Sequence, residues 1–94
     1  MRERLSEGDI GARLGSLEGW AREGHWLRKE YRFANFAEAM AFVNRVADVA
    51  EDLDHHPDID IRYDRVRLLT STHSEGGLTE MDFELARRID EGTR

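Results

Sequence analysis

Histidine and carboxylate side chains gather in the stretch EDLDHHPDID, residues 51–60. His55 and His56 are adjacent there, Pro57 follows them, and Glu51 precedes His55 by about one helical turn. Imidazole titrates near neutral pH, so histidines among acids could transfer protons. The same residue types also bind metals. A third use is structural: protonated histidines interact favourably with the dipole at a helix C-terminus, which explains one histidine but not a doublet.

A metal site needs ligands that converge on one ion. Neighbouring residues at a helix end point about 100° apart, so His55 and His56 are poorly placed to share one. Glu51 and His55 have i, i+4 spacing, and we expect them to share a helical face. His73 could complete a Glu–His–His set of the catalytic zinc type. The same carboxylate could instead orient and charge the imidazole without metal, and the spacing leaves both uses open.

A second group of candidate residues lies in LLTSTHSEGGLTEMD, at the end of a predicted strand. His73 has the strand parity opposite to Val66 and Leu68, so we expect it on the face away from the helices or at the rim of the sheet. The glycines that follow allow a close backbone approach to a ligand. Asp82 has a structural explanation as the acid of a capping box that begins at Thr79.

Three helices are predicted to position these residues, each opened by a capping residue with an acid three positions later. The cap and acid pairs are Ser6 with Asp9, Asn35 with Glu38, and Thr79 with Asp82. The first helix carries Ile10, Leu14 and Leu17, and the third runs to about Glu91. The middle helix spans 36–53, and the residue before a proline disfavours helix, so it must stop by position 56. Its expected inward stripe is Phe36, Met40, Val43, Val46 or Ala47, Ala50 and Leu53.

Four strands with alternating apolar residues are predicted between the helices. They cover about 19–21, 25–33, 58–63 and 66–73, with turns at 23–24 and 64–65. Hairpins separated by helices predict an α+β fold with a four-stranded antiparallel sheet and three helices on one face, in the order α-β-β-α-β-β-α. Residues 1–94 are expected to form one domain. The two edges of such a sheet need pairing or cover, which favours an oligomer.

Composition and charge narrow the functional classes. The formal net charge is −6 over 94 residues, which argues against nucleic acid as a partner. The basic clusters at 65–67 and 87–88 have acids nearby and are interpreted as a solvated surface of mixed sign. No segment has the length of a membrane helix or a signal peptide. We therefore expect a soluble cytoplasmic protein that binds no membrane, and the lack of cysteine fits a reducing compartment.

The spacing of seven residues resembles the pterin-4a-carbinolamine dehydratase family (4a-hydroxytetrahydrobiopterin dehydratases). The matched positions are Glu51, His55, His56, Pro57, Tyr63, His73 and Asp82. LDHHPD and LTSTHSEGGLTEMD look like the two most diagnostic segments of the family, and EGW at 18–20 is similar to its N-terminal tryptophan element. The resemblance extends from about Leu5 to Ile89.

The resemblance implies elimination of water from 4a-hydroxytetrahydrobiopterin to give quinonoid dihydropterin, without a metal or an organic cofactor. This reaction recycles the cofactor of aromatic amino acid hydroxylases. His55 and His73 would share the acid and base roles, and His56 would bind the substrate or share the proton traffic. Glu51 and Asp54 would orient or polarise the histidines. Asp82 would hold His73, and the implied substrate contacts are Trp20, His56, Ser71, Thr72 and His73.

The resemblance also bears on partners. Members of the family commonly form dimers or tetramers, so a homodimer or homotetramer is expected, with a functional link to an aromatic amino acid hydroxylase. The family includes a dimerisation cofactor of a homeodomain transcription factor. A non-catalytic pterin-binding or protein-interaction module is therefore the alternative function.

Overall fold

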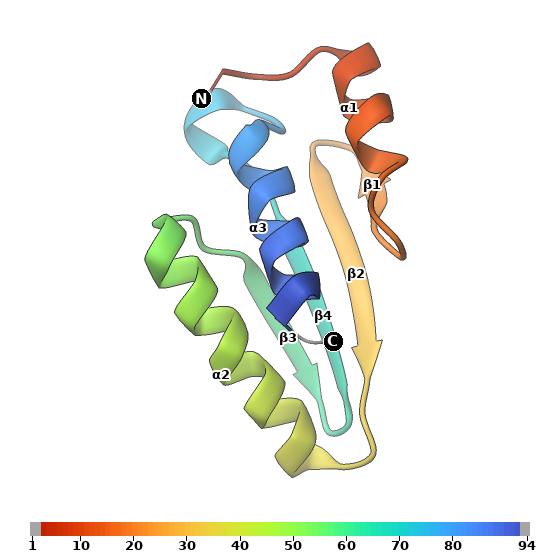
Figure 1. Cartoon of the computed structure of the whole chain (residues 1–94), viewed down its shortest axis with the longest axis vertical. Helices are drawn as coiled ribbons and strands as arrows, with labels where there is room; N and C mark the ends of the chain where they lie inside the picture. Colours follow the sequence, from red (N-terminus) through yellow and green to blue (C-terminus); the bar gives the residue numbers. More distant parts are fainter. Residues whose placement is uncertain (1–2, 93–94) are drawn as a thin grey trace.

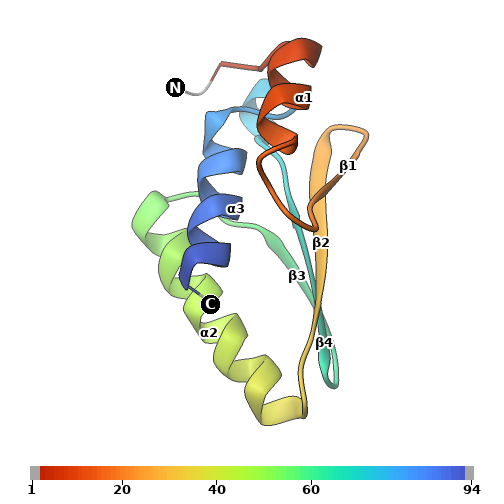
Figure 2. The same ribbon diagram turned by 45° about the vertical axis from the view of Figure 1, so that its right-hand side comes forward.

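The computed structural model describes residues 3–92 as one four-stranded antiparallel sheet and three α-helices, which confirms the predicted α+β fold and its element order. The elements are α1 (Glu7–Leu14), β1 (Ala21–Glu23), β2 (Trp26–Arg32), α2 (Phe36–Leu53), β3 (Asp58–Arg62), β4 (Arg65–Thr70), the 3-10 turn η1 (His73–Glu75) and α3 (Glu80–Gly92). In Figure 1, α3 lies in front of the strands β3 and β4, and α2 lies beside α3 to the left of the strands. Figure 2 shows the three helices on the same side of the sheet, leaving its other face without helices.

The strands follow the spatial order β1-β2-β4-β3, so β1 and β3 are the edges. In the register, Leu27 pairs with Thr70, and Asp58 pairs with Leu69. The first strand begins two residues later than predicted, and its turn falls at 24–25. The second turn falls at 63–64, one residue early, because Tyr63 takes a left-handed backbone conformation with φ 53°.

The helix starts agree with the sequence. The Ser6 side chain accepts the Asp9 N–H at 3.2 Å, and the Asn35 side chain accepts the Glu38 N–H at 2.9 Å. At the start of α3 the Thr79 hydroxyl accepts the Met81 N–H at 3.2 Å. These contacts satisfy N–H groups that the helix itself leaves without acceptors, which is why each helix begins where it does.

The core fills the space between the sheet and the helices. The predicted inward stripe of α2 is right at Val46 and Ala50 and wrong at Phe36. The buried residues of α2 are Ala39, Phe42, Val46 and Ala50. Phe36 is 49% exposed, and Ala47 is also exposed. The Phe42 ring lies 4.5 Å from that of Tyr31 and 5.0 Å from that of Phe33. The position of these two sheet aromatics selects which side of α2 faces inward, since several sides of the helix carry apolar residues.

Among the described residues, no helix has both the length and the apolar character needed to cross a bilayer.

Candidate active site

Three strand ends bring the candidate residues to one end of the sheet. Because β2 and β3 both run antiparallel to β4, the residues that precede them lie beside those that follow β4. The Ser71 hydroxyl donates to the His25 carbonyl at 2.6 Å, which fixes the start of β2 against the end of β4. By the same register, the segment 55–57 lies beside 70–72. The histidine doublet, His73 and Trp26 thus gather at one end of the sheet, the upper part of Figure 1.

The chain turns sharply after α2, and this turn separates the two histidines. The helix ends at Leu53, and Asp54 has left-handed φ and ψ of 52° and 45°. After this turn His55 is buried, with 7% exposure, whereas the His56 side chain is 54% exposed. The predicted pairing of Glu51 with His55 is therefore wrong. Glu51 Oε2 lies 2.5 Å from His56 Nε2, because the helix ends before it can place His55 above Glu51.

His55 contacts the buried carboxylate of Asp82, with 2.7 Å between Nε2 and Oδ1. Asp82 has no exposed surface and accepts three further hydrogen bonds. The other donors are the Thr70 hydroxyl at 2.7 Å, the Thr72 hydroxyl at 2.8 Å and the Thr79 N–H at 3.0 Å. Asp82 is thus both the capping-box acid of α3, as predicted, and the partner of His55.

The charge state of Asp82 follows from these contacts. Burial by itself raises the pKa of the Asp82 carboxyl, but the hydrogen bonds that it accepts, that from His55 first, outweigh burial and hold the pKa below its usual value. An ionised carboxylate only accepts hydrogen bonds, so His55 Nε2 carries the proton of this contact. The other ring nitrogen, Nδ1, is then the one that can exchange a proton with a ligand.

The predicted contact between His73 and Asp82 is wrong, because the hydrogen bonds that Asp82 accepts come from other residues. Asp82 is occupied by His55 on the helix side of the sheet. The predicted strand 66–73 ends at Thr70, and His73 begins the 3-10 turn η1 instead. His73 is exposed, and its ring packs edge-on against that of Trp26 at 5.1 Å between centroids. Trp26 was not among the site residues predicted from the sequence. Its parity in β2, opposite to buried Leu27, is a signal that could have placed it beside His73.

Trp20 is a core residue and not part of an open site. It is 6% exposed, and its Nε1–H donates to Asp90 Oδ2 at 2.8 Å. The Tyr31 hydroxyl donates to the other oxygen of Asp90 at 2.6 Å, and Lys29 Nζ lies 3.1 Å from Oδ2. The expectation that Trp20 lies against a flat ligand is wrong for this conformation, because this network anchors the indole to the end of α3.

The comparisons with known proteins agree with the histidine pattern. The family model described as pterin 4 alpha carbinolamine dehydratase matches residues 3–92. The chain belongs to this family. A relative from Thermomicrobium roseum is 54% identical over 88 residues, covering 94% of this chain and 95% of the relative. One from Sulfolobus acidocaldarius is 49% identical over 87 residues, covering 93% and 96%. Both carry the name pterin-4-alpha-carbinolamine dehydratase provisionally.

Two solved structures extend the comparison. A transcriptional coactivator/pterin dehydratase from Brucella melitensis has a TM-score of 0.90 at 35% identity, covering 95% of this chain and 97% of that one. A pterin dehydratase-like protein described as a RuBisCO assembly factor in the alpha-carboxysome has a TM-score of 0.68 at 25% identity. It covers 79% of this chain and 88% of that one. The dehydratase fold is therefore also found in proteins described by other roles.

The remaining candidate residues of this dehydratase-family chain surround the histidines. Ser71 and Thr72 are buried, and their hydroxyls serve the contacts with His25 and Asp82 described above. Asp54 caps α2 through its own N–H. Within residues 3–92 no three His, Asp or Glu side chains converge as metal ligands, so the Glu51, His55 and His73 set considered from the sequence does not form in this conformation.

Proposed function

We propose that this chain is a 4a-hydroxytetrahydrobiopterin dehydratase that eliminates water from pterin-4a-carbinolamine to give quinonoid dihydropterin. The observation that carries the proposal is the buried His55–Asp82 pair at the strand ends where His56 and His73 also lie. Membership of the family supports the same substrate. In this role the protein recycles tetrahydrobiopterin in the cytoplasm for an aromatic amino acid hydroxylase.

Dehydration of the carbinolamine requires only proton transfer from the enzyme. In the substrate a ring nitrogen adjoins the carbon that bears the hydroxyl. The bond between this carbon and oxygen breaks as the hydroxyl takes a proton and leaves as water, and the nitrogen loses its proton as the C=N bond forms. Two positioned proton carriers suffice, and general acid–base catalysis supplies ~10²–10⁴-fold. No oxidant, reductant or Lewis acid enters the balance.

We assign the two proton transfers jointly to His55, through its Nδ1, and His73. Asp82 positions His55 by accepting the hydrogen bond of its Nε2–H, which leaves Nδ1 as the ring nitrogen that faces a ligand. The exposed His56 binds the pterin or takes part in the proton transfers, and Glu51 orients it. Asp54 supports the doublet through the turn that it makes, and Ser71 and Thr72 line the strand end.

The test is a dehydratase assay on chemically generated 4a-carbinolamine. His55→Ala and His73→Ala are each expected to lower kcat by at least about 100-fold, the scale of acid–base catalysis. His25→Ala is the matched control, since this exposed histidine lies outside the family motif and should retain the wild-type rate. If the two folded site variants turn over as fast as the His25 variant, the assignment fails.

The second candidate function is a non-catalytic pterin-binding or protein-interaction module. The observation that favours it is that the two structural neighbours are described as a coactivator/dehydratase and as an assembly factor. Calorimetric binding of a reduced pterin, measured together with turnover, separates the functions. A module of this kind binds a pterin without accelerating dehydration, or does not bind it.

We also propose a homo-oligomer, at least a dimer, formed through the edge strand β3. Three large apolar side chains of the β3–β4 hairpin are exposed: Ile59 to 36%, Ile61 to 37% and Tyr63 to 67%. Phe36 lies beside them, with its ring stacked on that of Tyr63 at 6.3 Å between centroids. A second copy paired along β3 covers both the open backbone edge and these side chains.

A further inference from the structure

The face of the sheet without helices carries a row of three arginines. Arg65 of β4 lies between two strands, and the backbone register sets it directly opposite Arg32 of β2 on one side and Arg62 of β3 on the other. Directly opposed residues of an antiparallel pair project to the same face, and like charges in such positions are destabilising. The interpretation of this cluster as a mixed-sign surface does not explain why three positive charges stand in line.

The neighbouring row supplies acids, but too few to neutralise the arginines. There Arg67 lies between Glu30 and Asp60. Asp60 is shared by two arginines, with 3.3 Å from Oδ2 to Arg67 Nη2 and 3.4 Å from Oδ1 to Arg62 Nε. Within residues 3–92, neither Arg32 nor Arg65 forms an ion pair.

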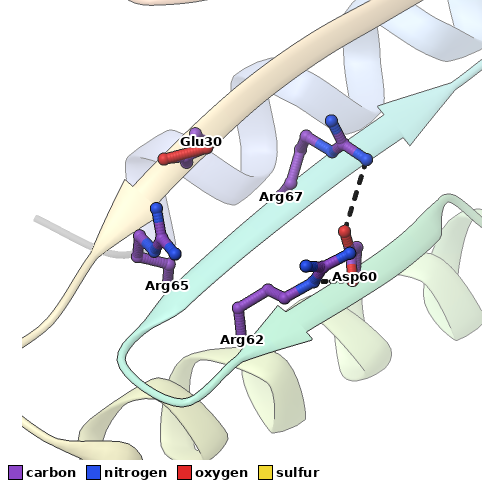
Figure 3. Close-up of a pocket in the computed structure, with 5 residues that line it drawn as sticks. All are labelled: Glu30, Asp60, Arg62, Arg65 and Arg67. Carbon is purple, nitrogen blue, oxygen red and sulfur yellow. Dashed lines mark hydrogen bonds and ion pairs between the residues drawn. The ribbon is translucent and has the colours of Figure 1, made fainter.

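The two rows together contain four arginines and two acids, a local charge of 4 − 2 = +2 in a chain whose net charge is −6. A hollow of about 180 Å³ opens among these side chains. Figure 3 shows Arg62 and Arg67 on either side of Asp60, with Arg65 nearer the hairpin. The lining residues are Glu30, Asp60, Arg62, Arg65 and Arg67, and all are charged.

We propose that this hollow binds the phosphate group of a small phosphorylated molecule. The lining residues carry a charge of 3 − 2 = +1, and Arg32 in the same row raises it to +2, which a phosphate dianion matches. The guanidinium fork fits the oxygens of a phosphate with paired hydrogen bonds. No aromatic or apolar side chain lines the hollow, so the recognised part of the ligand is the charged group and not a ring. A bound dianion also removes the repulsion between the opposed arginines, which the protein alone leaves unbalanced.

The size and position of the hollow favour a small ligand over a polyanion. A nucleic acid or an extended acidic chain would have to approach a protein with a net charge of −6, and the next row of the sheet ends in Asp58. The hollow adjoins the β3–β4 hairpin, at the lower end of Figure 1, whereas the histidines lie at the opposite end of these strands. Anion binding there is independent of the proposed dehydratase reaction.

The test is an NMR titration of the labelled full chain with inorganic phosphate, at constant ionic strength maintained with sodium chloride. Amide signals of residues 60–67 are expected to shift and saturate in the wild type. Arg65→Gln is expected to weaken binding by at least about tenfold, because it removes charged hydrogen bonds. Arg45→Gln removes an equal charge from an exposed position of α2 and should bind phosphate as the wild type does.

Three outcomes overturn the inference. Phosphate shifts that do not saturate, or that Arg65→Gln leaves unchanged, mean that the hollow is not the site. Shifts produced only by a long polyanion such as heparin mean that the surface recognises an extended chain. The dehydratase rate is measured on the same samples, and Arg65→Gln should leave it unchanged, so failure of either proposal is seen separately.

Discussion

At the scale of single residues, one carboxylate has two duties. Asp82 completes the capping box of α3 and also holds the imidazole of His55. The first duty could be predicted from local spacing alone. The second could not, because it depends on a turn at residue 54 and on the approach of two segments 27 positions apart. The same limit explains why Trp20 was predicted at the site in place of Trp26. No local pattern shows that Trp20 donates to Asp90 or that Trp26 packs against His73.

Asp82→Asn tests this double duty. The asparagine side chain places an NH2 group where a carboxylate oxygen accepted hydrogen bonds, so a donor then faces donors. We expect a loss of about 2–4 kcal/mol in the free energy of unfolding, measured by urea denaturation. Turnover should fall by part of the ~10²–10⁴-fold that acid–base catalysis provides. Thr70→Val is the control for stability, since it removes one hydrogen bond of Asp82 and should cost only about 1 kcal/mol. Equal stability of wild type and Asp82→Asn contradicts the network.

The pH dependence of stability provides a separate prediction. Because the pKa of Asp82 is lowered by folding, its ionised form stabilises the fold above the ordinary aspartate pKa of about 3.9. That stability is lost as the pH falls below this value through the lower pKa of the folded state. Urea denaturation between pH 7 and pH 2 should show that the free energy of unfolding falls less steeply for Asp82→Asn than for the wild type. Parallel curves contradict the lowered pKa.

At the scale of elements, the helix starts and the order of helices and strands along the chain were predictable because caps and alternation act within a few residues. The rotation of α2 was not, because apolar residues occupy several of its sides and the sheet selects between them. Phe42 packs against the rings of Tyr31 and Phe33, yet the predicted stripe omitted it and included the exposed Phe36. Of the two alternatives Val46 and Ala47, only Val46 is buried.

The rotation of α2 can be tested by a pair of substitutions. Phe42→Ala should cost about 3–5 kcal/mol of unfolding free energy, because it leaves a cavity in the core. Ala47→Gln should change stability by less than about 0.5 kcal/mol, since this position is exposed. Chemical denaturation measures both, and a severe loss from Ala47→Gln would mean that Ala47, and not Val46, faces the core.

The end of α2 is a second testable element. Asp54 adopts a left-handed conformation that a β-branched residue tolerates poorly, so Asp54→Val should cost about 1–3 kcal/mol and displace the histidine doublet. Asp54→Gly accepts the same backbone without strain. Turnover should therefore be better preserved in the glycine variant. Equal activity of the two variants would show that the turn does not position the histidines.

At the scale of the whole molecule, the structure has an uncovered strand edge and a sheet face without helices. Charge distinguishes the two surfaces: the β3 edge exposes the apolar Ile59 and Ile61 toward the helix side, and the open face beside the hairpin is rich in arginine. We expect the first to bind a second copy and the second to bind an anion. The hairpin between β3 and β4 belongs to both surfaces.

Ile61→Lys tests the oligomer. A lysine on an edge strand opposes pairing, so the variant should elute as a monomer in size-exclusion chromatography with light scattering, while the wild type elutes as a dimer or larger. Ser16→Lys, which adds the same charge at an exposed residue after α1, should retain the wild-type assembly. A monomeric wild type at about 100 μM, in the micromolar range where modest interfaces form, contradicts the proposal.

The shared carboxylate has a consequence for amide hydrogen exchange. The Thr79 N–H is held by Asp82 Oδ2 while His55 is held by Oδ1, so one backbone amide reports on the partner of a proposed catalytic imidazole. Anything that pulls Asp82 away from its donors exposes this amide to solvent before α3 as a whole unfolds. Its exchange rate therefore follows the state of the site in the unaltered protein, without a label or a substitution near the histidines.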